Sequence, residues 1–217
     1  MCELPLCRKR VGLAAAALSC LCLSCNLLTP IIFIGEHQKK VFPEFDKLPQ
    51  HRVAVVVWVP ESTLFDYPHA RYELATYLGE KLSYEMEQRK LGTTVVDARD
   101  VEDYLQKDLD ARIDPSRVGK RFRADYVIYV EVLRFQVRDP DSPLFLKGEI
   151  EASVVVHDTR KAAPPMTKFD LTTVTSKFPP GGRMMMTATN SRQVREGLYR
   201  AFAEDIARKF YEYNVDL

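Results

Sequence analysis

The sequence predicts a single α/β domain in which a mixed sheet of about five strands packs against helices, in the order β-α-β-α-α-β-β-β-α. Three observations predict this fold: a continuous apolar run at residues 53–59, apolar residues at every fourth position over residues 74–86, and two alternating segments at residues 146–156 and 167–177. Hydrophobic residues make up 46% and charged residues 28% of the 217 positions, as in an ordinary globular chain.

The first predicted strand, residues 53–59, is apolar throughout and ends at Pro60, which is typical of a strand buried on both faces. Pro68 suits the first turn of the helix that follows. This helix should end before Gly92, and its apolar stripe consists of Leu74, Leu78, Leu82 and Met86. A short second strand is expected at residues 93–96.

Two short helices should come next, each begun by an aspartate that accepts a hydrogen bond from a backbone N–H group. Asp97 or Asp100 can begin the first, and Asp114, ahead of Pro115, can begin the second. A long strand is predicted at residues 124–137, where apolar and aromatic residues dominate.

The next two strands, residues 146–156 and 167–177, alternate between apolar and polar positions, so one face of each should be buried and the other wet. The last helix is expected over residues 191–213. Its apolar stripe consists of Val194, Leu198, Ala201, Phe202, Ile206 and Phe210.

The N-terminus has the pattern of a secretory signal. Arg8, Lys9 and Arg10 precede an uncharged run at residues 11–35, and all five cysteines lie within the first 25 residues. Leu23-Ser24-Cys25 resembles the lipobox of bacterial lipoproteins, whose cysteine is acylated and becomes the first residue, and Cys20 is the alternative site. Membrane lipid would then be a partner through Cys25, with no thiol left for a disulfide or a metal site.

An uncleaved transmembrane helix is the alternative, because 25 uncharged residues can span about 30 Å of hydrocarbon. Ordinary cleavage without acylation is a third outcome. With either anchor, the positive charges before the run place the body of the protein outside the cytoplasmic membrane. We therefore expect a signal peptide at residues 1–24, a lipidated tether at 25–50 and the α/β domain at 51–217.

Residues 118–130 contain a phrase that resembles a signature of several bacterial envelope proteins, G-x-x-x-x-A-D-Y-V followed by a hydrophobic residue. It begins at Gly119, and the families are the curli-secretion lipoproteins, the N-terminal domain of TolB and the lipoprotein activators of penicillin-binding proteins. The exported chain also resembles uncharacterised secreted planctomycete lipoproteins, through its strand at residues 52–56 and its final helix at 206–213. These resemblances imply an envelope location and a protein-binding domain, and they carry over no catalytic residue.

Known catalytic and cofactor-binding motifs are missing from the sequence. It contains neither a Gly-x-Ser-x-Gly elbow nor a phosphate-binding Gly-x-x-x-x-Gly-Lys-Ser/Thr loop. The net charge of +1 argues against nucleic acid as a partner. The histidines lack metal-ligand spacing and are expected at surface or capping positions: His37, His51, His69 and His157. We thus expect no enzyme activity, no cofactor and no metal.

A carboxylate-dependent hydrolase is the alternative function. It would use acids around the first short helix, namely Asp97, Asp100, Glu102, Asp103, Asp108 and Asp110. Paired carboxylates can act as acid and base or bind a hard cation. A solvated helix face is the simpler interpretation, because acids near a helix N-terminus interact favourably with its dipole. The hydrolase would need a pocket that gathers these acids with a base.

Three adjacent methionines, Met184, Met185 and Met186, are the candidate partner contact, because flexible thioethers suit an adaptable surface. The alternative is a partly buried loop packed under the sheet. Trp58 is expected in the core. The sequence therefore predicts a membrane-anchored protein of the cell envelope, on the periplasmic side, whose non-catalytic domain binds another envelope protein or assists an envelope complex.

Overall fold

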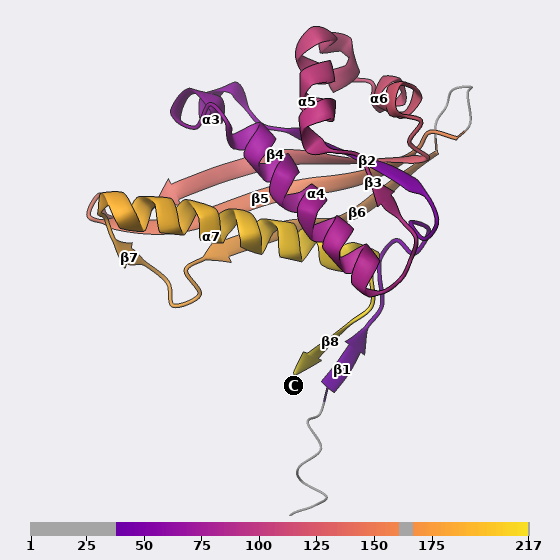
Figure 1. Cartoon of the computed structure of the whole chain (residues 1–217). Helices are drawn as coiled ribbons and strands as arrows, with labels where there is room; N and C mark the ends of the chain where they lie inside the picture. The colour runs from indigo at the N-terminus through magenta and orange to yellow at the C-terminus, as the bar shows by residue number, and fades with distance from the viewer. Residues whose placement is uncertain (1–37, 161–166, 217) are drawn as a thin grey trace, which may run out of the picture. The chain divides into compact units, whose positions relative to one another are not determined.

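The computed structural model describes residues 38–160 and 167–216. The chain forms two compact units. In the smaller unit, strands β1 (Gln38–Val41) and β8 (Tyr213–Asp216) form a two-stranded sheet. The larger unit spans Phe42–Tyr213 and contains the α/β fold (Figure 1).

A six-stranded mixed sheet forms the larger unit, with the strand order β3-β2-β4-β5-β6 and with β7 paired to β5. Strand β2 is parallel to β3 and β4, and the remaining pairs are antiparallel, so the predicted mixed sheet is confirmed. The strands are β2 (Arg52–Trp58), β3 (Thr94–Val95), β4 (Tyr126–Arg138), β5 (Phe145–Asp158), β6 (Thr167–Phe178) and β7 (Met184–Met185).

Helices cover both faces of this sheet (Figure 1). Helices α4 and α7 lie on one face and α5 and α6 on the other, as the two hydrophobic clusters of the larger unit require. The helices are α3 (Glu61–Asp66), α4 (Ala70–Gln88), α5 (Ala98–Lys107), α6 (Pro115–Phe122) and α7 (Ala188–Ala207), with 3-10 turns at Leu109–Arg112 and Arg208–Phe210.

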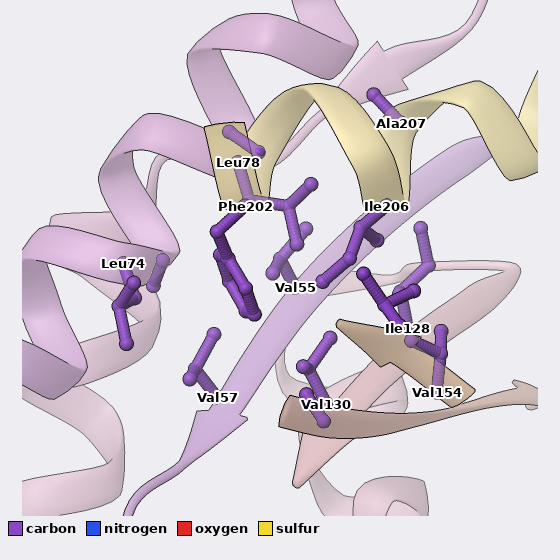
Figure 2. Close-up of a cluster of buried hydrophobic side chains, with 14 of the residues drawn as sticks. Val55, Val57, Leu74, Leu78, Ile128, Val130, Val154, Phe202, Ile206 and Ala207 are labelled. Carbon is purple, nitrogen blue, oxygen red and sulfur yellow. The ribbon is translucent and has the colours of Figure 1, made fainter. Parts of the chain in front are cut away.

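The main core lies between the sheet and the α4–α7 pair. Figure 2 shows Phe202 and Ile206 of α7 facing the valines of β2 and β4, next to Leu74 and Leu78 of α4. Each of these four residues is at most 1% exposed. Burying such a side chain stabilises the fold by about 1.5–3 kcal/mol, so the four-residue period predicted for α4 identifies its packing face.

A second, smaller core lies on the opposite face of the sheet. Ala54 and Val56 of β2 and Val127 of β4 pack there against Val101 of α5 and Val118 of α6. Strand β2 is therefore buried on both faces over most of its length, as its continuous apolar run predicts.

Both short helices begin at aspartates named from the sequence. The Asp97 carboxylate accepts a hydrogen bond from Arg99 N at 2.7 Å, and the Asp114 carboxylate accepts one from Ser116 N at 3.0 Å. Pro115 occupies the first turn of α6. These side chains satisfy backbone N–H groups that have no partner inside the helix, so each helix starts where its cap is.

The envelope-protein phrase has a structural role. A Cβ atom at Gly119 would lie 2.5 Å from Thr159 Cβ, so only glycine lets α6 approach the end of β5 this closely. Thr159 Oγ1 then donates to Ala124 O at 2.6 Å, and the Asp125 carboxylate accepts from Arg52 N at 2.9 Å. The phrase thus joins the start of β4 to both neighbouring strands.

The folded unit begins earlier than the predicted domain boundary. Phe45 and Leu48, in the segment predicted as a tether, are 3% and 1% exposed and belong to the main core. Phe45 meets Tyr126 edge to face at 5.3 Å, and the Glu44 carboxylate binds the Lys209 ammonium at 2.7 Å. Sparse apolar residues between prolines gave no period, although two of them anchor this segment.

The last helix differs from its predicted bounds of 191–213. It begins at Ala188 because Thr187 accepts a hydrogen bond from Asn190 N at 3.1 Å. It ends at Ala207, and the chain passes through a 3-10 turn into β8. Phe210 is buried as predicted, but from this turn and not from the helix.

Candidate functional site

The predicted lipidation sites, Cys25 and the alternative Cys20, lie outside the described residues, as does the predicted signal peptide. Within residues 38–160 and 167–216, every helix is too short or too polar to span a bilayer. The anchor therefore stays a prediction, and the described residues bear only on what the exported domain presents.

The three candidate contact methionines lie in β7 and just after it. Strand β7 continues the line of β6 along β5. Met184 is opposite buried Leu146 and packs against the main core, as the partly buried alternative expects. Met185 and Met186 are 67% and 42% exposed, and Met186 N donates to the carbonyl of Leu144, itself 69% exposed. We call Leu144, Met185 and Met186 the methionine patch.

The connection before β7 holds this patch on the β4–β5 hairpin. Asp139, buried in the hairpin turn, accepts a hydrogen bond from Arg183 Nη1 at 3.3 Å. Gly182 has a φ of +107°, which L side chains rarely adopt, so the chain reverses there only with glycine. The exposed apolar side chains are thus presented by a fixed turn.

A groove of about 440 Å³ lies on the sheet face that α5 and α6 cover only in part. These helices pack over Ala54 and Val56 but stop short of Trp58, which is 38% exposed. The expectation that Trp58 is a core residue is therefore wrong. We call this the aromatic groove, and its lining includes Trp58, Ile113, Pro115, Tyr129, Glu131, Ser153, Val155, His157, Lys168 and Asp170.

The register of the sheet sets the order of groups on the groove floor. Trp58 of β2 is the register partner of Glu131 of β4, and Glu131 is in turn opposite Ser153 of β5. Tyr129 precedes Glu131 by two positions and shares its face of the strand. One carboxylate therefore lies beside two aromatic side chains at this end of the groove.

Charge in the groove is not balanced at this end. Burial raises the pKa of the Tyr129 phenol, and the negative charge of Glu131 raises that pKa further. Farther along the same face, Glu149 and Glu151 lie 3.3 Å and 3.5 Å from Arg134 nitrogens. Glu131 has no such ion pair among the described residues, so its charge is open to a cation from outside.

His157 is buried at 5% exposure, which corrects the expectation of a surface or capping histidine. Its ring meets that of Tyr129 edge to face at 6.1 Å, and its Nδ1 atom has no hydrogen-bond partner. Burial lowers the pKa of His157, and the positive charge of Lys168 lowers it further. The imidazole is therefore neutral near pH 7 and adds no positive charge to the groove.

The acidic residues around α5 do not gather into one site. Asp97 caps the helix, the buried Glu102 carboxylate accepts bonds from Arg71 at 3.0 Å, and Asp108 is paired with Arg117 at 3.0 Å. Within the part of the chain that the structure describes, no group of three or more ligand side chains could hold a metal ion. Glu102 differs from the solvated-face interpretation, and the hydrolase alternative lacks the acid–base pocket that it needs.

Sequence reasoning missed Trp58 and Glu131 as a pair. One signal was present: Glu131 is the single charged residue of the apolar segment 126–133, two positions after Tyr129. A charge at such a position indicates an uncovered stretch of the strand. The register that brings it to Trp58 needs the parallel pairing of β2 and β4.

Comparisons with known proteins give structural likenesses alone. No family model and no curated protein matches the chain. The fold is similar to the PelC dodecamer from Paraburkholderia phytofirmans, with a TM-score of 0.41, 12% identity, and 80% of this chain and 97% of that chain covered.

Two further solved structures are similar at lower scores. The lipoprotein GNA1162 from Neisseria meningitidis has a TM-score of 0.34 and 15% identity, with 71% of this chain and 99% of that chain covered. The protein CT253 from Chlamydia trachomatis has a TM-score of 0.35 and 11% identity, with 72% and 95% covered. At these scores and identities, the likenesses assign no activity to this chain.

Proposed function

We propose that this chain is a lipoprotein of the cell envelope whose α/β domain binds another protein without catalysing a reaction. The observation that carries the proposal is the methionine patch, in which Leu144, Met185 and Met186 stay exposed on an ordered hairpin. Exposed apolar side chains that gather on a fixed surface are typical of protein contacts.

The chemistry of the patch favours a protein partner. Met185 and Met186 offer unbranched thioethers that adapt to the shape of a partner surface. Burying them would stabilise a complex by about 25 cal/mol for each Å² of apolar surface removed from water. The Arg183–Asp139 pair beneath them fixes the backbone, so little ordering of the backbone is needed on binding.

The anchor in this proposal is the acylated Cys25, with Cys20 as the alternative. Two or more acyl chains are needed for stable attachment, which diacylglyceryl modification supplies. The basic residues before the apolar run support export of the domain, to the periplasmic side of the cytoplasmic membrane.

Mass spectrometry of the chain purified from native membranes tests the anchor. We expect a mature protein that begins at Cys25 and carries a diacylglyceryl group, and we expect Cys25→Ala to abolish the modification. An intact Met1 would replace the lipoprotein with a single-pass anchor. Continued acylation of the Cys25→Ala variant would move the site to Cys20.

Photo-crosslinking tests the methionine patch. We expect a photoreactive amino acid at Met185 to capture one discrete protein in native membranes, and the same group at exposed Tyr84 to capture none. Replacing Met186 with glutamate should abolish the crosslink while the circular dichroism spectrum stays unchanged. Equal crosslinks from Met185 and Tyr84 would contradict the proposed role of the patch.

A further inference from the structure

The aromatic groove offers a second contact whose chemistry differs from that of the methionine patch. Trp58, Tyr129 and Glu131 lie together because β2 and β4 are parallel and in register at this point. Trp58 is 38% exposed, although it is the only tryptophan and lies at the end of an otherwise buried strand. The uncovered end of the groove is therefore both aromatic and acidic.

An aromatic ring beside an unpaired carboxylate favours an organic cation. The face of an indole or phenol ring attracts an ammonium or guanidinium group, by about 0.5–2 kcal/mol. Glu131 supplies the opposite charge, and it has no ion pair among the described residues, whereas Glu149 on the same face has Arg134. His157 is neutral near pH 7 and does not repel such a cation.

The surroundings of this end suit a side chain carried by a polypeptide. Ile113, on the wall of the groove, is 85% exposed, and Leu133, two positions beyond Glu131 on β4, is 51% exposed. These apolar groups can contact the residues on either side of a basic side chain. A small free amine would leave them uncovered.

We propose that the Trp58–Glu131 end of the aromatic groove binds a lysine or arginine side chain of the partner protein. The proposal rests on the proposed function in one respect, because it takes the partner to be a protein. It adds a specificity: the segment of the partner that enters this groove is basic and has apolar neighbours.

Fluorescence of the single tryptophan tests this proposal directly in the full-length chain. The probes are acetyl-Leu-Lys-Leu-amide, the same peptide with uncharged norleucine in place of lysine, the same peptide with glutamate, and n-butylamine. We expect a saturable change in Trp58 emission with the lysine peptide, which weakens as salt is added. The norleucine and glutamate peptides should give no saturable change.

Variants then identify the carboxylate. Glu131→Gln keeps the shape of the side chain and removes its charge, so the dissociation constant of the lysine peptide should rise about fivefold or more. Glu149→Gln, on the same face, is the matched control and should leave it unchanged. Equal affinity for the lysine and norleucine peptides, or no effect of Glu131→Gln, would overturn the proposal.

The butylamine arm separates the two sources of a cation. Binding of butylamine as tight as that of the lysine peptide would overturn the polypeptide as the occupant and indicate a free amine. Failure of the groove is also distinguishable from failure of the proposed function. A partner crosslinked at Met185 without any titration by the lysine peptide contradicts only the groove, and a titration without a crosslinked partner contradicts only the methionine patch.

Discussion

Replacing Gly119 with alanine should destabilise the protein, although the same change usually stabilises a helix. Alanine is favoured over glycine inside a helix by about 1 kcal/mol. At this position, however, the new Cβ atom would lie 2.5 Å from Thr159 Cβ, 2.6 Å from its Oγ1 and 2.7 Å from its Cγ2. All three contacts are shorter than van der Waals separation, so α6 or Thr159 must move.

The size of the effect follows from these contacts. Overpacking of this kind costs about 1–3 kcal/mol. Displacing Thr159 also weakens its hydrogen bond to Ala124 O, now 2.6 Å long, which contributes about 0.5–1.5 kcal/mol. After subtracting the gain in helix propensity, we expect Gly119→Ala to lower the free energy of unfolding by about 1–3 kcal/mol.

Urea denaturation of the full-length chain, followed by circular dichroism, measures this difference. Gly79→Ala in α4 is the matched control, because the nearest atom to its new Cβ, Val95 Cγ1, is 3.9 Å away. That variant should be as stable as the parent or more stable by up to about 1 kcal/mol. Thr159→Gly combined with Gly119→Ala should recover part of the loss. If Gly119→Ala stabilised the protein as Gly79→Ala does, the close approach of α6 to β5 would be refuted.

Three further predictions follow from burial and from pKa shifts. Phe45→Ala should cost about 3–5 kcal/mol of unfolding free energy, and Phe42→Ala, at a residue 70% exposed, far less in the same urea titration. Hydrogen bonds from Ser116 lower the pKa of Asp114, so its contribution is present above the ordinary aspartate pKa and is lost as pH falls through the lowered one. Asp114→Ala should therefore cost about 1 kcal/mol at pH 7 and less in acid, by urea titration at each pH. Burial lowers the pKa of His157, so the unfolded chain binds the proton first, and stability should fall as pH drops below about 6.5. His157→Leu should reduce that slope, and an unchanged slope would contradict the burial of this imidazole.

The parts of the fold that the sequence predicted well are those decided by local pattern. The four-residue period through Leu74 and Leu78 identifies the buried face of α4. Alternation from Leu146 onward identifies the core face of β5, whose residues are buried at every second position over most of the strand. Side-chain caps also act locally, so Asp97 and Asp114 mark the helix starts correctly.

The parts that sequence reasoning missed depend on which elements meet in space. Trp58 continues an apolar run, and nothing within that run indicates that α5 and α6 end before they reach it. The burial of His157 depends on β5 lying between β4 and β6. Phe45 belongs to the core because η2, which contains Phe210, returns to the start of the domain, and the two rings are 6.3 Å apart. The methionine patch was placed by residue type, but the contribution of Leu144 follows from pairing between β5 and β7.

The position of α7 has a consequence for a chain that crosses a membrane with its N-terminus first. Phe202 and Ile206 complete the core that β2 and α4 begin, so the main core cannot close until almost the whole chain has been delivered (Figure 2). An incomplete chain would leave the valines of β2 uncovered and prone to aggregation. Translocation is thus complete before the domain folds, and in an exported chain lipid attachment near residue 25 could precede folding. A nascent chain of this design remains competent for secretion until its last helix emerges.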